Sequence, residues 1–308
     1  MTPFNPNCHT IILENDYMIV EIIPYAASVY QIYLKVNKLL KPVLSTPKKV
    51  EDFVVNTLSY GRTIGRTAGK LHKTDESSKY IDFNDELFMM HGGKNKFSTK
   101  QFSIDYKEKQ SVGLSYFASN LSDGFLGNLE VKVTYELEGN NFVVKHEAST
   151  DVDSLCNITF HPYFNLDQSP NLLSHNLKIN SSKYLGINNE GRFDQVMDVS
   201  NTHRDYTTSK PLVINDETKL DDIFMLNSLY ACSLATKNIR MNVLTNYPSL
   251  VVYTQNKPTN TALSNALKDA LHAGIAIETQ KPQNKLPLLK KDEIYSYWTK
   301  YQFEIINS

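Results

Sequence analysis

The stretch "LEVKVTYEL", residues 129–137, constrains the fold more than any other part of the sequence. Apolar and polar side chains alternate strictly along it, and this period of two is typical of a β-strand with one buried face. The apolar positions are Leu129, Val131, Val133, Tyr135 and Leu137. We therefore expect a long amphipathic strand here.

Shorter strands are predicted at "NLKIN" (176–180), "SLVVYTQN" (249–256) and "YQFEIIN" (301–307). Turn signals such as "DG" at Asp123 and "NEG" at Asn189 break these runs at short intervals. Many short strands with few helices favour an antiparallel sandwich or barrel over an α/β fold.

One helix is predicted, at "NTALSNALKDALHAG" (260–274). Leu263, Leu267 and Leu271 would share one face with Ala270, and Gly274 would stand at the C-cap. The sequence has no Ser- or Pro-rich linker and no clear internal repeat. We therefore predict an all-β protein, a large antiparallel β-sandwich with little helix, in which residues 1–308 form a single domain.

The composition excludes several classes of function. The net charge of −1 gives no basic surface for nucleic acid, and no apolar run is long enough to cross a membrane. The start, "MTPFNPNCHT", lacks a signal-peptide pattern, so a cytoplasmic protein is expected. Cys8, Cys156 and Cys232 are widely spaced, and an odd count with no C-x-x-C motif argues against a disulfide framework and a zinc site. No phosphate-binding glycine loop is present. We predict no metal and no cofactor.

His161 lies near the end of a predicted strand in "ITFHPYFNL". If Ile158 and Phe160 point into the core, His161 points to the opposite face, and Pro162 fixes the backbone just after it. A lone histidine is usually a satisfied structural residue. Its other interpretation is an acid or base that works near neutral pH.

Glu278 lies in "GIAIETQ", where Ile275 and Ile277 form one face of a strand and Ala276 and Glu278 the other. A carboxylate in so apolar a strand is costly to bury without a partner. Glu278 is therefore either in water on an edge strand or in a cleft that raises its pKa and suits it to act as a base.

Four further residues are weaker candidates. His91 precedes two glycines in "FMMHGGKNKF", and Arg66 and Lys70 lie among small residues in "TIGRTAGKL". Asp221 adjoins an apolar run in "KLDDIFML". Taken alone, Arg66 and Lys70 are better explained by a solvated basic loop, and Asp221 is ordinarily explained by a turn or a helix cap.

Together and in this order, these motifs resemble the aldose 1-epimerases, also called galactose mutarotases. "TIGRTAGKL" is similar to the family's "TVGRVANRI", "MHGG" to "LHGG" and "ITFHPYFNL" to "LTNHSYFNL". "LDDIFML" is similar to "FDHNFVL", "YPSLVVYT" to "PGVQFYT" and "GIAIETQ" to "GFCLETQ". The stretch from Leu121 to Leu137 also resembles a family motif, and the match runs from about residue 60 to about residue 285.

The resemblance implies a sandwich whose concave face holds a monosaccharide, and an isomerase that interconverts the α and β anomers of a free aldose such as galactose or glucose. It implies Glu278 as the general base and His161 as the general acid. His91 and Asp221 would bind the sugar, with Lys70 in place of a family arginine and Arg66 nearby as a further cation.

The sequence departs from the family at Gly69, where the family has asparagine, and at Val251, where it has glutamine. Polar contacts to the sugar are thereby lost. Three alternatives stay open. One is a sugar binder without turnover, and another is a hexose-6-phosphate 1-epimerase in which Arg62, Arg66 and Lys70 supply cations. A structural sandwich without a ligand is a third. A monomer or homodimer is expected.

Overall fold

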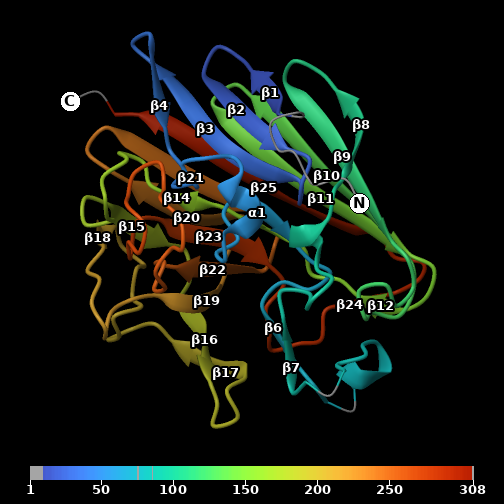
Figure 1. Cartoon of the computed structure of the whole chain (residues 1–308). Coiled ribbons are helices and arrows are strands. Elements are labelled where there is room, and N and C mark those ends of the chain that lie inside the picture. Colours follow the sequence, from blue (N-terminus) through green and yellow to red (C-terminus); the bar gives the residue numbers. More distant parts are fainter. Residues whose placement is uncertain (1–9, 75, 85, 307–308) are drawn as a thin grey trace.

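A nine-stranded antiparallel sheet forms the largest layer of the protein (Figure 1). The computed structural model describes residues 10–74, 76–84 and 86–306. In spatial order the strands are β18 (Lys210–Pro211), β15 (Asn176–Ile179), β20 (Tyr230–Ala235), β21 (Ile239–Thr245), β25 (Tyr295–Ile305), β11 (Asn141–Thr150), β10 (Leu129–Glu138), β9 (Ser111–Ala118) and β8 (Ser103–Lys107).

Two further antiparallel sheets accompany it. The six-stranded sheet has the order β14 (Tyr163–Phe164), β23 (Ile275–Gln280), β22 (Ser249–Tyr253), β19 (Asp221–Met225), β16 (Lys183–Ile187) and β17 (Phe193–Asp198). The four-stranded sheet has the order β1 (Ile11–Glu14), β2 (Met18–Ile23), β3 (Ser28–Val36) and β4 (Leu39–Pro42).

Short elements connect these sheets. The two-stranded pairs are β5 (Arg62–Ile64) with β13 (Thr159–His161), β6 (Lys70–His72) with β7 (Phe88–Met90), and β12 (Ser154–Leu155) with β24 (Leu288–Leu289). The helical segments are α1 (Asp52–Val55) and the 3₁₀ turns η2 (Ser77–Lys79) and η3 (Phe97–Thr99). No helix within the described residues is long and apolar enough to cross a bilayer.

One hydrophobic cluster holds the layers together. It takes Val133 and Tyr135 from the nine-stranded sheet, Val20 from the four-stranded sheet, and Phe224 and Ile277 from the six-stranded sheet. Each such buried side chain contributes roughly 1.5–3 kcal/mol by leaving water. The prediction of an all-β antiparallel sandwich with little helix is therefore confirmed. The single-domain assignment of residues 1–308 stays a prediction.

The strand predictions hold where alternation was clear. The stretch 129–137 is β10, whose apolar side chains are all buried. The stretch 176–180 corresponds to β15, and 249–256 contains β22. The stretch 301–307 contains the end of the longer strand β25, which stops at Ile305. Residue 307, the last of the predicted stretch, lies outside the described part of the chain.

The predicted helix at 260–274 is wrong, because tertiary hydrogen bonds take over its backbone. The amide of Lys48 donates to the carbonyl of Ala262, and the amide of Ser264 donates to the carbonyl of Thr46. Of the expected apolar face only Leu263 is buried, and Leu267 is 82% exposed. Local periodicity here competes with pairing to a segment about 215 residues away in sequence, and the pairing prevails.

A buried ion pair fixes the loop between β9 and β10. Arg66 is fully buried, and its Nε and Nη2 each donate to an Asp123 carboxylate oxygen at 3.0 Å. Its Nη1 donates to the carbonyl of Gly127 at 3.0 Å, and the guanidinium lies 5.3 Å from the centroid of the Phe125 ring. This fully satisfied bidentate pair gives Arg66 a structural role.

We expect Asp123→Ala to lower the free energy of unfolding by about 3–5 kcal/mol, because it leaves the Arg66 guanidinium buried without a counter-charge. Urea unfolding followed by fluorescence measures the change. The matched control is Asp216→Ala, which removes the partner of Lys219 from an ion pair on the surface and should leave the midpoint nearly unchanged. Equal midpoints for the two variants would contradict the structural role.

Candidate active site

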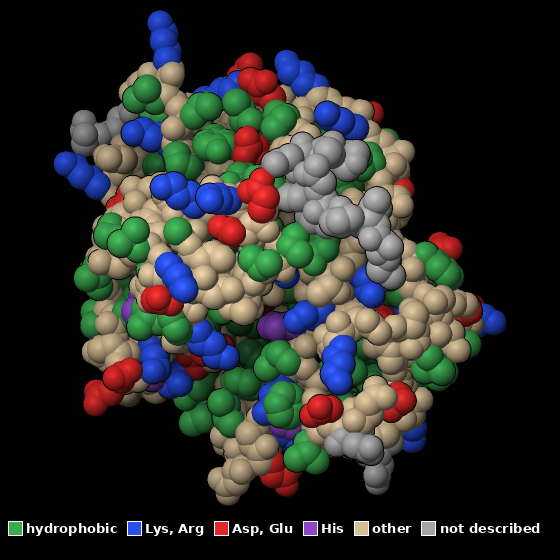
Figure 2. Space-filling model, in the orientation of Figure 1, with side chains coloured by type: hydrophobic (Ala, Val, Ile, Leu, Met, Phe, Trp, Pro, Cys, Tyr) green, Lys and Arg blue, Asp and Glu red, His purple; other side chains and the backbone are tan. Residues whose placement is uncertain are grey.

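A pocket of about 340 Å³ opens on the face of the six-stranded sheet that points away from the core. Figure 2 shows a hollow on this side of the molecule, with histidine at its bottom and Lys and Arg side chains around it. The sheet contributes Tyr163, Phe193, Asp221, Ile223, Val251, Tyr253, Glu278 and Gln280 to the lining. Connecting segments contribute Thr57, Leu58, Ser59, Gly69, Lys70, Met90, His91, Lys96, His161, Lys257 and Gln283.

The period of two along β23 divides core from pocket. Ile275 and Ile277 belong to the hydrophobic cluster, and Glu278 and Gln280 line the pocket. The neighbouring strand β22 follows the same rule, since Val252 is in the core and Val251, paired with Glu278 in the register, faces the pocket. The division of faces predicted for "GIAIETQ" is therefore confirmed, and Glu278 is buried rather than solvated.

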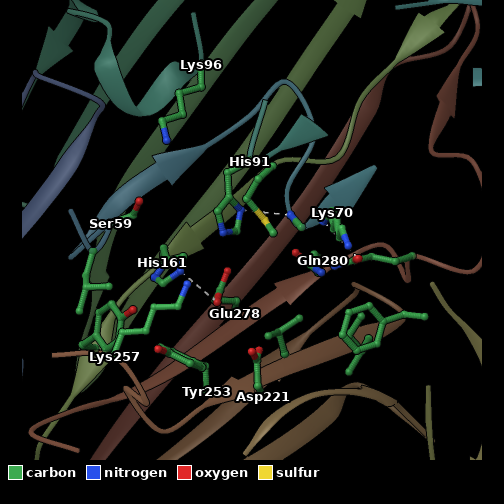
Figure 3. A pocket seen from close by; sticks show the side chains of 18 of the residues that line it. Ser59, Lys70, His91, Lys96, His161, Asp221, Tyr253, Lys257, Glu278 and Gln280 are labelled. Carbon is green, nitrogen blue, oxygen red and sulfur yellow. Dashed lines mark hydrogen bonds and ion pairs between the residues drawn. The ribbon is translucent and has the colours of Figure 1, made fainter. Parts of the chain in front are cut away.

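His161 and Glu278 meet at the bottom of this pocket (Figure 3). His161 Nε2 lies 3.2 Å from Glu278 Oε1, and their exposed fractions are 6% and 3%. The Thr159 hydroxyl, on the same strand as His161, donates to the carbonyl of Thr279 at 2.9 Å and ties that strand to β23. Two residues 117 positions apart in sequence are thus held in direct contact.

Burial moves the two pKa values in opposite directions. It raises the pKa of Glu278 well above its ordinary value, and the nearby Asp221 carboxylate raises it further. Burial, with smaller contributions from His91 and Arg62, lowers the pKa of His161 to about 3. Both shifts favour the uncharged forms, so the pair as a whole holds one proton over a wide pH range.

His91 stands beside this pair with a defined tautomer. Its Nδ1 accepts a hydrogen bond from the amide of Gly69 at 3.2 Å, so in the neutral ring the proton is on Nε2. The ring meets His161 edge-on, with 5.8 Å between centroids. Burial and the charges of Lys96 and Lys257 lower the pKa of His91 to about 4. Its Nε2–H is thus available as a neutral donor.

The glycine after His91 is required by close packing against the backbone of Gly65. A Cβ on Gly92 would lie 2.1 Å from the carbonyl oxygen of Gly65, and its φ of +86° is one that glycine adopts without strain. Gly69 has a similar φ of +75°, and a Cβ there would lie 1.8 Å from the side chain of Gln283. Gln283 thus occupies the space beside Gly69.

Among the other predicted site residues, Asp221 and Lys70 line the pocket and Arg66 does not. Burial raises the pKa of Asp221 above its usual range. The Lys70 ammonium lies 4.2 Å from the centroid of the Phe88 ring. Arg66 is instead paired with Asp123 in the interior, so its substrate-binding assignment is withdrawn.

Sequence analysis missed several residues of the pocket. Tyr253 and Gln280 could have been found, because each is two positions from a residue already placed on the pocket face of its strand. Gln280 brings an amide with no hydrogen-bond partner among the described residues. Lys96 and Lys257 come from irregular segments, and no periodicity indicates where their side chains point.

The sequence is similar to known proteins along nearly its whole length. The family model described as aldose 1-epimerase matches residues 9–302. The chain belongs to the aldose 1-epimerase family. It is 29% identical to the aldose 1-epimerase of Haemophilus influenzae, with 96% of this chain and 95% of that protein covered. It is 25% identical to human galactose mutarotase, with 95% and 93% covered.

Solved structures of the aldose 1-epimerase fold superpose over nearly the whole chain. The crystal structure of a galactose 1-epimerase from Lactobacillus acidophilus gives a TM-score of 0.83 at 25% identity and covers 96% of this chain and 94% of that one. A GalM/aldose epimerase homologue from C. elegans gives 0.86 at 19% identity, covering 97% and 99%. The resemblance drawn from the motifs is confirmed.

We expect the imidazoles of His91 and His161 to stay neutral at pH 6, because their pKa values are lowered to about 4 and about 3. An unperturbed histidine would be about three-quarters protonated at that pH. Imidazole ¹⁵N NMR from pH 7.5 to pH 5 measures this, with signals assigned from His91→Gln and His161→Gln. A titration midpoint near 6.5 for either residue would contradict the prediction.

Proposed function

We propose that this protein is an aldose 1-epimerase that interconverts the α and β anomers of a free aldose such as galactose or glucose. The observation that carries the proposal is the buried contact of 3.2 Å between His161 Nε2 and Glu278 Oε1 on the floor of the pocket. Family membership supports the reaction type, and relatives named for galactose and aldoses support the substrate class.

The reaction opens and recloses a cyclic hemiacetal. Glu278 as carboxylate takes the proton of the C1 hydroxyl, and the C1–O bond to the ring oxygen breaks as C1 becomes a carbonyl. The ring oxygen keeps the bonding electron pair and takes a proton from His161. The open aldehyde rotates about C1–C2 and recloses with both proton transfers reversed, so atoms and charge balance.

The one-proton state of the pair suits this cycle. Before ring opening the proton is on His161, and after it the proton is on Glu278, so the pair's total charge never changes. Burial favours the second arrangement in the empty pocket. The C1 hydroxyl of a bound sugar donates a hydrogen bond to the ionised carboxylate and so favours the first arrangement.

The remaining polar groups are assigned to the sugar hydroxyls. His91 would donate from Nε2 near the ring oxygen, since its Nδ1 is already occupied. Asp221 would accept from hydroxyls, and Lys70 and the free amide of Gln280 would donate. The apolar side chain of Val251 faces the same space, which reduces the number of polar contacts that this chain makes.

A sugar binder without turnover is less well supported, because binding alone does not need an acid–base pair in contact. The cytoplasmic location and the monomeric or homodimeric state stay predictions from the sequence.

We expect Glu278→Gln and His161→Gln each to slow enzymatic mutarotation by about 100-fold or more, because each removes one partner of the proton transfer. Polarimetry on freshly dissolved α-D-galactose and α-D-glucose measures the rate above buffer. The control is Glu304→Gln, which alters a carboxylate on β25 that is paired with Arg240 and should keep the wild-type rate. Full activity in either site variant would remove the corresponding role.

We also expect kcat/KM to stay constant as the pH falls from 7 to about 5, because a second proton enters the pair only near the His161 pKa of about 3. At alkaline pH the activity should fall as Glu278 loses the pair's proton, at a pH above the ordinary carboxyl range. Initial rates in buffers of constant ionic strength measure the profile. A loss centred near pH 6.5 on acidification would contradict it.

A further inference from the structure

Three lysines line the pocket beside the acid–base pair: Lys70, Lys96 and Lys257. For Lys96 and Lys257, no carboxylate of the described residues lies within 4.0 Å of the ammonium group. The charge of Lys257 does reach Asp221, where it partly offsets the rise in the pKa of that carboxyl that burial and Asp222 cause. A neutral sugar would leave these charges unpaired. Such a concentration of unpaired cations is more typical of a site for an anion.

Arg62 strengthens the positive charge behind Lys96. Its side chain is buried, with an exposed fraction of 5%, and Nη1 donates to the carbonyl of Ser98 at 3.2 Å. Its Nε and Nη2 have no hydrogen-bond partner within the described chain. Burial lowers the pKa values of Lys96 and His161, and the charge of Arg62 lowers both a little further. The two partly desolvated cations repel each other, and a bound anion would relieve that repulsion.

The cations are not spread evenly round the pocket. The charges of Lys96 and Lys257 both lower the pKa of His91, and Figure 3 shows the two lysines on the same side of the pocket as His161. Lys70 lies on the opposite side, where the Phe88 ring already faces its ammonium group at 4.2 Å. The two ammonium groups without a carboxylate partner therefore lie on the same side of the pocket as His161, the residue assigned to protonate the ring oxygen.

The chemistry of a pyranose identifies what would lie there. C5 is bonded both to the ring oxygen and to C6, so a group on C6 projects on the ring-oxygen side of the sugar. With Glu278 at the C1 hydroxyl and His161 at the ring oxygen, the C6 substituent is directed toward Lys96 and Lys257. This placement rests on the proposed function.

We propose that the pocket takes aldohexoses with an anionic group on C6, a phosphate ester or a carboxylate, in preference to the neutral sugar, and that Lys96 and Lys257 bind that group. A phosphate ester carries a charge of about −1.5 to −2 at neutral pH, which matches two free ammonium groups. The acid–base chemistry at C1 is unchanged, because the anion lies on C6 and takes no part in ring opening.

The test measures anomer exchange at equilibrium by NMR exchange spectroscopy on the anomeric protons. The sugars are galactose, galactose 6-phosphate and galacturonate, with each sugar's own rate in buffer subtracted. We expect kcat/KM for an anionic sugar to exceed that for galactose by about tenfold or more, and the advantage to shrink as salt is added. Which anionic sugar is faster identifies the group on C6.

The decisive variants are Lys96→Met and Lys257→Met, which keep the length of the side chain and remove its charge. Their matched controls are Lys94→Met and Lys268→Met, exposed lysines of the same two segments that do not line the pocket. We expect the ratio of kcat/KM for anionic over neutral sugar to fall about tenfold in the first two only. Circular dichroism checks the fold of each.

Equal kcat/KM for galactose and both anionic sugars in the wild type would overturn this inference and leave the proposed function intact. Equal ratios in Lys96→Met and Lys94→Met would also overturn it. Absence of catalysed exchange with every sugar would instead overturn the proposed function itself, and this inference with it.

Discussion

The site depends on one constraint, the alternation of side chains across the six-stranded sheet. Ile277 and Val252 face the hydrophobic cluster, and Glu278 and Val251, which adjoin them in their strands, face the pocket. Because the side-chain period of a strand is two, a shift of one residue in register would exchange core and pocket. The burial of the apolar face therefore also fixes the position of the carboxylate.

The protein deals with buried charge in three different ways. Arg66 is neutralised by a bidentate carboxylate, Asp123, and every donor group of its guanidinium is used. His161 and Glu278 reduce their charge by sharing one proton, which leaves the pair able to move it. Arg62 has no carboxylate partner among the described residues. Of these groups only His161 and Glu278 line the pocket, where their shared proton is available to a ligand, and Arg62 is buried outside the lining.

The strengths and errors of prediction have physical causes. Strand β10 could be predicted because alternation is a local property that burial of one face enforces. The stretch 260–274 has helical periodicity, but its backbone groups bond to the distant segment around Thr46 instead. Arg66 and Lys70 look alike in "TIGRTAGKL", and only packing separates the interior cation from the one in the pocket.

By itself, the sequence determined the class of fold and the candidate pair His161 and Glu278, because alternation and local motifs record which face of a strand is buried. Only the tertiary structure decided that these two side chains touch, that Arg66 belongs to the core, and that Lys96 and Lys257 reach the same pocket. The reason is that contact between residues far apart in the chain depends on how sheets and loops pack, and no local pattern carries that information.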